Sequence, residues 1–358
     1  MTEGAAESVP RGTSTGRHSG DRPAAARVRD ALDDAVSYAA PGVLGAGEVM
    51  GGGGGMTPIA EEAARAARVL HPDDHRMPRP AHRRVLTVAN QKGGVGKTTS
   101  TVNLAAALAL HGARVLVVDL DPQGNASTAL GVEHRSGTPS VYEVLLGEIA
   151  LDEAVAVCDR SPDLLCVPAT IDLAGAEIEL VSMLNRESRL KAALSSGALD
   201  RLDVDYVVID CPPSLGLLTL NAMVAAPEIL IPIQCEYYAL EGLSQLLSNI
   251  GLVQSHLNPG LHVSTILLTM YDGRTKLADQ VTHEVRTHFG DLVLRTVIPR
   301  SVKVSEAPGF GQTVLTYDPG SRGAMSYLDA ARELAVRGAA RETEPSDGPP
   351  ADDERETR

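Results

Sequence analysis

Short apolar runs alternate with longer amphipathic segments through the middle of this chain. Runs of that length, rich in β-branched residues, predict buried strands, and the longer segments between them predict helices. The strands are expected at Val85–Ala89, Val115–Asp119, Leu164–Pro168, Tyr206–Asp210, Ile229–Pro232, Val263–Leu268 and Val293–Ile298. The helices are expected at Thr98–His111, Ala174–Leu184, Leu217–Ala225, Leu240–His256 and Ala278–Phe289.

This alternation predicts the fold class. Strands that alternate with helices need crossover connections, which are right-handed, and they form a mainly parallel sheet with helices on both faces. The expected class is therefore α/β, with a doubly wound, mainly parallel sheet. In such a sheet, ligands bind beyond the carboxyl ends of the strands. We expect the functional residues in the segments that follow the strands.

The two ends differ in composition from the alternating core. Residues 1–83 are rich in Ala, Gly, Arg, Ser and Pro and include five consecutive glycines at 51–55, which predicts a mostly disordered extension. Residues 339–358 are rich in proline and acids, which predicts a disordered tail, so the folded domain is expected over residues 84–338. Two candidate short helices and a candidate start codon fall within the extension: Ala24–Ala39, Ile59–Leu70 and Met56.

Composition narrows the choice of protein class. The 358-residue chain is 43% hydrophobic but only 3% aromatic, so its core must be mainly aliphatic. No apolar run approaches the roughly 20 residues of a membrane span, and the four scattered cysteines are typical of reduced thiols in the cytoplasm. The net charge of −14 argues against wholesale binding to nucleic acid or anionic membranes, but it leaves room for a local basic patch.

A glycine-rich segment joins the first expected strand to the first expected helix. It consists of Gln91, Lys92, Gly93, Gly94, Val95, Gly96, Lys97, Thr98 and Thr99. The segment is close to the phosphate-loop pattern G-x-x-x-x-G-K-[ST], in which glycines turn backbone amides toward phosphates at a helix N-terminus. Lys97 can then reach the β- and γ-phosphates, and the Thr98 hydroxyl can ligate Mg²⁺. Lys92 is not needed for this cradle and requires another explanation.

Acidic residues follow two of the expected strands. Asp119 and Asp121 end one strand and lie on the same side of the chain if that strand continues. Asp121 is suited to orienting an attacking water near the γ-phosphate, and Asp210, after another strand, to holding a water on Mg²⁺. The candidate magnesium ligands are thus Thr98, Asp121 and Asp210, the last through water. The alternative is that these acids cap the helices that follow the strands.

Together these motifs resemble the ParA/Soj chromosome partitioning ATPases, which carry the deviant Walker A loop of the wider ParA/MinD group of P-loop NTPases. The resemblance covers about residues 84–337, and four further segments extend it. These segments are Pro168–Thr170, Leu173–Glu177, Gln234–Gly242 and Ser305–Pro308.

The resemblance implies an activity and its partners. Members of this family bind ATP with Mg²⁺ as a sandwich dimer with two nucleotides at the interface, and the extra lysine, here Lys92, reaches the partner's nucleotide. The ATP-bound dimer binds double-stranded DNA without sequence preference, and a ParB-type centromere-binding protein stimulates the weak hydrolysis. We therefore expect a cytoplasmic, nucleoid-associated ATPase that partitions replicated origins of a chromosome or plasmid.

The resemblance also assigns residues by position. Arg274 and Lys303 match basic residues implicated in DNA binding, although relatives often have arginine where this chain has Lys303, and lysine lacks the bidentate fork. Met270, Pro299 and Arg300 match segments that flank the adenine base. Arg300 is alternatively part of the DNA-binding surface.

Three other functions compete with this interpretation. A MinD-like membrane-cycling ATPase needs a basic amphipathic C-terminal helix, whereas residues 341–358 contain three prolines, many acids and no apolar face. An iron–sulfur reductase needs cysteines at a dimer interface, and neither Cys211 nor Cys235 fits that place. A non-hydrolysing DNA-binding adaptor with a vestigial nucleotide site is disfavoured by the intact set of chemical groups. That set is Lys92, Lys97, Thr98, Asp121 and Asp210.

Overall fold

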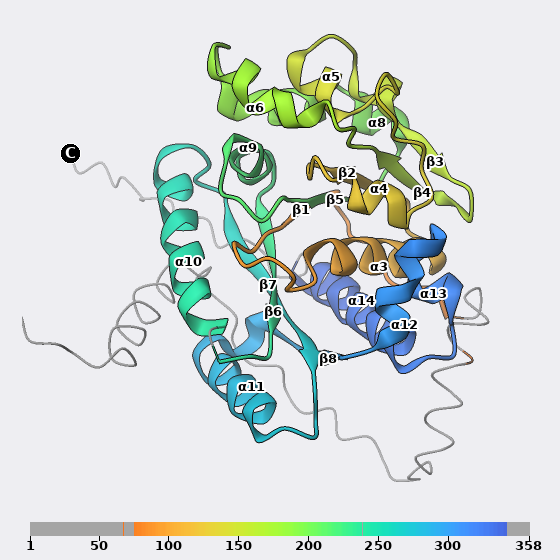
Figure 1. The fold of residues 1–358 in the computed structure, drawn as a ribbon, viewed down its shortest axis with the longest axis vertical. Coiled ribbons are helices and arrows are strands. Elements are labelled where there is room, and N and C mark those ends of the chain that lie inside the picture. Colours follow the sequence, from red (N-terminus) through yellow and green to blue (C-terminus); the bar gives the residue numbers. More distant parts are fainter. Residues whose placement is uncertain (1–66, 68–74, 238, 342–358) are drawn as a thin grey trace, which may run out of the picture.

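The computed structural model describes residues 67, 75–237 and 239–341 of the chain, and within them a single eight-stranded sheet carries helices on both faces (Figure 1). The strands are β1 (Arg84–Val88), β2 (Val115–Asp119), β3 (Ala156–Cys158), β4 (Ser161–Val167), β5 (Tyr206–Asp210), β6 (Glu228–Gln234), β7 (His262–Tyr271) and β8 (Val293–Pro299). Their order across the sheet is β3-β4-β2-β5-β1-β6-β7-β8, and every neighbouring pair is parallel except β3 and β4. The expected doubly wound, mainly parallel α/β fold is confirmed.

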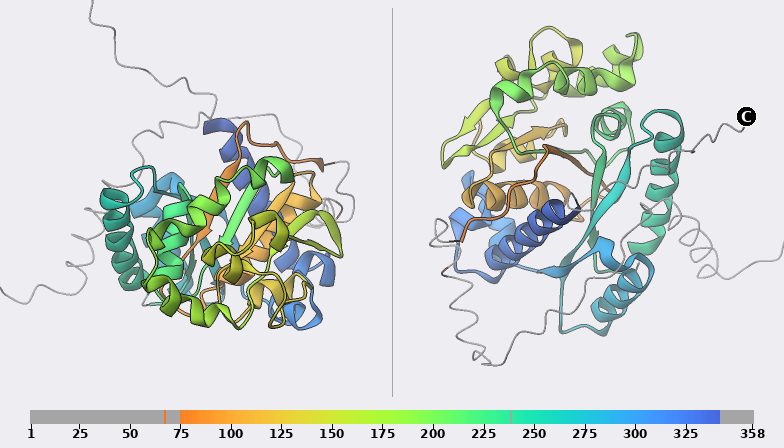
Figure 2. Two further views of the ribbon diagram at one scale, coloured as in Figure 1. Left: turned by 90° about the horizontal axis from the view of Figure 1, so that it is seen from above. Right: turned by 180° about the vertical axis from the view of Figure 1, so that it is seen from behind.

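Helices connect the strands and form the two outer layers. They are α3 (Lys97–Leu110), α4 (Asn125–Ala129), α5 (Val141–Leu146), α6 (Leu173–Val181), α7 (Arg189–Leu194), α8 (Ala198–Leu202), α9 (Leu217–Ala225), α10 (Ala239–His256), α11 (Lys276–Phe289), α12 (Val302–Glu306), α13 (Val314–Tyr317) and α14 (Arg322–Arg341). Helices α3 and α14 cover one face of the sheet, and α9, α10 and α11 lie on the other (Figures 1 and 2).

The period-two pattern of the strands divides the core between these layers. In β2, Val115 and Val117 pack into the cluster under α3 and α14, whereas Leu116 and Val118 pack into the cluster on the opposite face. All five residues of β2 are buried, as expected of a central parallel strand covered on both faces. The aliphatic core therefore follows directly from the alternation of side chains along the chain.

Several elements were absent from the sequence-based prediction: strand β3, helix α14 and the short helices α4, α5, α7, α8, α12 and α13. Strand β3 has three residues and pairs antiparallel with β4 at the edge of the sheet, too short to give a periodic signal. Helix α14 is long, but alanines supply much of its apolar stripe, and it is stabilised by packing on α3 and β8. Its buried alanines are Ala324, Ala330, Ala331 and Ala335.

The folded core also extends beyond the limits expected from composition. Residues 75–83, expected to belong to the disordered extension, pack on the core: Met77 is buried, its N–H donates to the His111 carbonyl over 3.1 Å, and the Arg83 guanidinium donates to the Val204 carbonyl over 3.0 Å. At the other end, α14 includes residues 339–341, expected to begin the tail. The candidate start codon and nearly all of the two candidate N-terminal helices lie outside the described residues.

A buried ion pair ties three elements together at the amino ends of the strands. Arg84 of β1 donates to both carboxylate oxygens of Glu228 of β6, over 2.8 and 2.6 Å, and to the Leu334 carbonyl of α14 over 2.9 Å. Burial disfavours the ionised carboxylate, but the hydrogen bonds and charge of Arg84 outweigh it and hold the pKa of Glu228 below its ordinary value. This pair lies at the edge of the sheet opposite to the expected functional residues.

We predict that Glu228→Ala lowers the free energy of unfolding by about 3–5 kcal/mol at pH 7, because it leaves Arg84 buried and unpaired. Urea denaturation measures the change. Because the folded state lowers the pKa of Glu228, its stabilising effect is present above the pKa of the unfolded state and disappears as the pH falls through the folded one. Asp152→Ala, which removes the partner of the exposed Arg201, is the matched control and should have a far smaller effect. Equal losses would refute the special role of the buried pair.

Candidate functional site

The glycine-rich loop is shaped to bind an anion. It connects β1 to α3, and Gly94 and Gly96 adopt φ values of 73° and 90°, which residues with a Cβ rarely adopt. Gly96 is the N-cap of α3, and the first turn of that helix carries neither a capping side chain nor an acid. The amide groups at this helix end are therefore available to a phosphate, which the helix dipole also favours.

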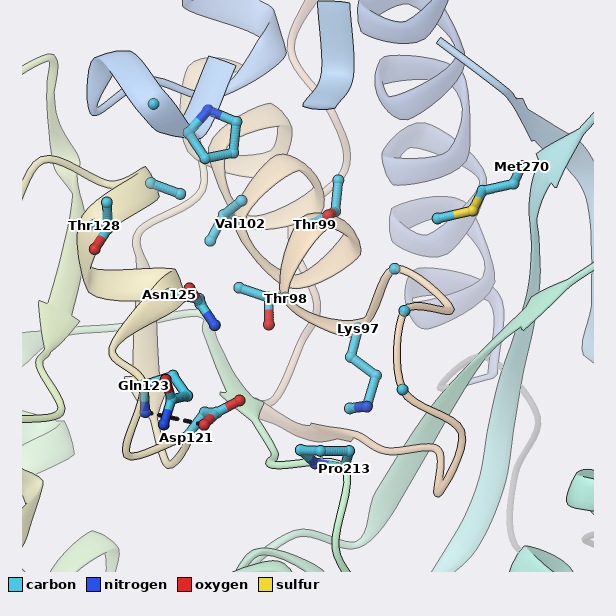
Figure 3. Close-up of a pocket in the computed structure, with 16 residues that line it drawn as sticks. Lys97, Thr98, Thr99, Val102, Asp121, Gln123, Asn125, Thr128, Pro213 and Met270 are labelled. Atoms are coloured by element: carbon cyan, nitrogen blue, oxygen red, sulfur yellow. Dashed lines mark hydrogen bonds between the residues drawn. The ribbon is translucent and has the colours of Figure 1, made fainter. Parts of the chain in front are cut away.

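A cavity of about 630 Å³ lies beside this loop. Its walls come from the loop and the start of α3, the segment after β2, and single residues from more distant parts of the chain, including Pro213 and Met270 (Figure 3). Lys97, Thr98 and Asp121 all line it. The cavity therefore brings together the predicted phosphate-binding residues and one of the predicted acids.

Lys97 is nearly enclosed by the loop. It is 7% exposed, and its ammonium group donates a hydrogen bond to the Lys92 carbonyl over 3.3 Å. Burial lowers the pKa of Lys97, and the nearby Asp210 and Asp121 oppose that shift. An ammonium group in this position gains from any additional negative charge in the cavity, such as that of a phosphate.

Asp210 ends β5 and is completely buried. One carboxylate oxygen accepts a hydrogen bond from the Thr101 hydroxyl over 3.1 Å, while the other, Oδ2, has no hydrogen-bond partner among the described residues. Burial and the neighbouring Asp119 raise the pKa of Asp210, and the nearby hydroxyls of Thr98 and Thr101 oppose that shift. An orphaned carboxylate oxygen beside a phosphate-binding loop fits a water held on a divalent cation, so the residues present are compatible with Mg²⁺.

The two carboxylates near the end of β2 have different surroundings. The strand stops at Asp119, so the condition under which Asp119 and Asp121 would lie on the same side of the chain is not met. Asp119 is fully buried and accepts hydrogen bonds from Asp121 N over 3.1 Å and from Ser127 N and Oγ over 2.8 and 2.7 Å. Ser127 N belongs to the first turn of α4, whose N-cap residue is Gly124, so Asp119 accepts from one of the backbone donors that this helix end leaves free. Asp121 instead faces the cavity, and its Oδ1 accepts from Gln123 N over 3.0 Å (Figure 3).

Lys92 lies beside the cavity, and its ammonium group contacts another part of the chain. The side chain is 35% exposed, and Nζ lies 3.2 Å from Glu236 Oε2, in the segment after β6. The Lys92 backbone N–H donates to the Asn90 side chain over 3.0 Å, which fixes the loop rather than the ammonium group. A partly exposed pair of this kind contributes little stability, so Lys92 can exchange it for another anion at low cost.

The residues assigned to the adenine base are divided between two cavities. Met270 lines the first cavity and has a φ of 50°, which is uncommon outside glycine. Pro299 and Arg300 instead line a second cavity of about 820 Å³, together with Arg274. They lie at the carboxyl end of β8, the edge strand, which is separated from β1 and its loop by β6 and β7. Lys303 is exposed on α12 and does not line this second cavity.

Two threonines contribute to the site without having been predicted in these roles. Thr101 lies one turn after Lys97 on α3, donates to the Lys97 carbonyl over 3.1 Å and also holds Asp210. Its i, i+4 spacing from Lys97 is a signal that could have revealed it. Thr269 of β7 donates to the Val95 carbonyl over 2.8 Å and so anchors the phosphate loop. That contact joins residues 174 positions apart, and local sequence carries no signal for it.

The structure also bears on the competing functions. All four cysteines are buried, whereas a cluster shared between two copies needs thiolates at the surface. Over the described ranges 75–237 and 239–341, no helix is both long and apolar enough to cross a bilayer. The segment on which a MinD-like amphipathic helix would depend lies almost wholly beyond Arg341, outside the described part.

Comparison with known proteins gives consistent matches. Residues 83–263 match the family model described as an AAA domain. The sporulation initiation inhibitor protein Soj of Bacillus subtilis is 53% identical over 256 residues, covering 71% of this chain and 99% of Soj. The chromosome partitioning protein ParA of Caulobacter vibrioides is 51% identical, covering 71% and 94%. Among solved structures, a cobyrinic acid a,c-diamide synthase from Mycobacterium smegmatis with a bound ATP analog and magnesium is 43% identical, with a TM-score of 0.59 over 70% of this chain and 93% of that one.

The contrast between the two β2 carboxylates gives a prediction. Asp119→Ala should lower the free energy of unfolding by about 1–3 kcal/mol, because it leaves buried donors of Ser127 and Asp121 without an acceptor. Asp121→Ala, the matched control two residues away, should change it much less. Urea denaturation of both variants measures the difference. Similar losses in the two variants would contradict the structural role given to Asp119.

Proposed function

Because the chain belongs to the Soj/ParA family of chromosome partitioning proteins, we propose that it is an ATPase that partitions replicated DNA. One observation carries this proposal: Lys97, Thr98 and Asp121 face a single cavity at the carboxyl edge of the sheet, next to the orphaned oxygen of Asp210. A cavity of about 630 Å³ lies within the usual range for small-molecule sites.

The proposed substrate is ATP with Mg²⁺. The loop amides and Lys97 hold the β- and γ-phosphates, while the Thr98 hydroxyl and, through a water, Asp210 hold the cation. When bound, Mg²⁺ would supply positive charge against the negative charge that develops on the phosphates. The related synthase structure with an ATP analog and magnesium supports this assignment.

The proposed role of Asp121 is to orient the attacking water. It lines the cavity, and the Gln123 amide fixes its carboxylate through a hydrogen bond of 3.0 Å. A carboxylate held in this way can accept a hydrogen bond from a water placed in line with the γ-phosphate. Asp119, whose oxygens are occupied by its own hydrogen bonds, is not assigned this role.

Lys92 is proposed to act on the nucleotide of a second copy. In a single chain its ammonium group turns to Glu236, a weak and partly exposed partner that a nucleotide phosphate can replace. Dimerisation upon ATP binding would supply that phosphate and place a second cation near the developing charge. The resulting dimer is proposed to bind double-stranded DNA non-specifically on the nucleoid, and a ParB-type protein to stimulate hydrolysis and release.

ATP turnover by the full chain tests this proposal. We expect slow hydrolysis by the protein alone and faster hydrolysis with both duplex DNA and the cognate ParB-type protein. Asp121→Ala should bind a fluorescent ATP analogue as the unaltered protein does but lower turnover by about 100-fold or more. Turnover at background with DNA and ParB both present would instead support the non-hydrolysing adaptor.

A mixing experiment tests whether Lys92 acts between copies. Lys92→Ala and Asp121→Ala should each be inactive alone. In a mixed dimer, the site with intact Asp121 receives intact Lys92 from the other copy, so mixing should restore up to about half of the activity per heterodimer. If Lys92 acted within its own chain, every site in the mixture would lack one group and no activity would return.

A further inference from the structure

The second cavity, of about 820 Å³, is lined by three arginines from separate parts of the chain. Arg274 follows β7, Arg300 follows β8, and Arg322 is the first residue of α14. We call this cavity the arginine groove. All three residues are exposed, so their guanidinium groups can be reached by a large ligand.

These cations differ in how far acids of the same chain neutralise them. Arg274 makes a bidentate pair with Asp272, over 2.8 and 2.7 Å, and Lys303, outside the groove, pairs with Glu306 over 3.2 Å. Neither Arg300 nor Arg322 makes an ion pair with any of the described residues, although the charge of Arg300 also helps to lower the pKa of Asp272. Of the three residues predicted from the sequence to bind DNA, Arg274 and Lys303 are thus more neutralised than Arg300.

We propose that Arg322, together with Arg300, binds the phosphodiester backbone of double-stranded DNA in the arginine groove. The inference rests on the proposed function, and it adds to the DNA-binding surface a residue, Arg322, that the sequence did not reveal. An unpaired guanidinium presents a fork that matches two phosphate oxygens, and it gives up no internal partner when it binds. Arg274 would have to leave Asp272 before it could bind a phosphate in the same way.

The position of Arg322 at a helix N-terminus strengthens the electrostatic attraction of the groove for a phosphate. It begins a helix of 20 residues whose first turn contains no acid, so the positive end of the helix dipole points to the same end of the groove. Asp272 is the acid among the residues that line the groove. The local field therefore favours an anion, although the whole chain carries a net charge of −14.

The groove also shares two chain segments with the nucleotide cavity. After β7, Met270 lines the nucleotide cavity and Tyr271 lines the groove. In the segment from α12 onward, Ser305 lines the groove and Pro308 lines the nucleotide cavity. Because two short segments of the chain line both cavities, occupancy of the nucleotide cavity can alter the shape of the groove, as DNA binding by the ATP-bound form would require.

Fluorescence anisotropy of labelled duplex DNA, with the full chain and a non-hydrolysable ATP analogue, tests the proposal. Arg322→Ala should weaken binding several-fold, equally for two unrelated sequences, and lower the slope of log affinity against log salt by about 1 for each phosphate that is no longer neutralised. Arg295→Ala is the matched control, since Arg295 is an exposed arginine of β8 that does not line the groove. Asp272→Asn should tighten binding, because it releases Arg274, and a gain cannot result from misfolding.

The possible outcomes distinguish a failure of the role given to Arg322 from a failure of DNA binding by the protein. If Arg322→Ala binds DNA as Arg295→Ala does, the role of Arg322 is wrong while DNA binding by the protein stands. If the unaltered protein binds no DNA with the analogue present, the DNA-binding part of the proposed function fails, and the inference with it. Binding to vesicles of anionic phospholipid in place of DNA, with loss in Arg322→Ala, would overturn DNA as the ligand. Unchanged thermal unfolding and nucleotide affinity of Arg322→Ala exclude a general defect.

Discussion

Two carboxyl groups are buried side by side at the carboxyl edge of the sheet. The rest of the nucleotide site depends on how their negative charges are compensated. Asp119 and Asp210 are register partners on β2 and β5, and both are completely buried. Burial raises the pKa of each, and a neighbouring carboxylate raises it further, Asp121 for Asp119 and Asp119 for Asp210, so the protein must compensate these charges. Asp119 is compensated internally, by Ser127 and the backbone. Asp210 keeps an unpaired oxygen and depends on cations from elsewhere.

The surrounding elements are arranged to provide that compensation. Strand β1 lies next to β5, with Val88 in register with Asp210, so the loop that follows β1 starts beside this carboxyl group. The loop leads into α3, which brings Lys97 close to Asp210 and provides Thr101 as its hydrogen-bond donor. A divalent cation with its phosphates would complete the charge balance. The site thus favours a metal–phosphate complex over either component alone.

In both proposed binding surfaces, some of the positive charges are partly neutralised by acids of the same chain and others are not. At the nucleotide cavity, Lys92 is held by a weak and partly exposed partner, Glu236, which it would exchange for a phosphate in the proposed dimer. In the arginine groove, Arg274 is held by Asp272 while Arg322 is unpaired within the described residues. A cation without an internal ion pair can therefore bind a ligand at once, whereas a paired cation must first leave its acid. This difference would allow the binding of one ligand to depend on the binding of another.

The sequence by itself determined the features that depend on neighbouring residues. Apolar runs located every long strand, and the glycine loop with its lysines located the phosphate site, because period, turn chemistry and helix starts are local properties of the chain. Only the tertiary structure decided the features that depend on distant residues. It directed the Asp119 carboxylate to the first turn of α4 and left Asp121 facing the cavity, although the two are separated by one residue, because β2 ends at Asp119. It also placed Arg300 in a groove with Arg322, since the packing of α14 on the sheet, rather than any local pattern, brings that helix beside the end of β8.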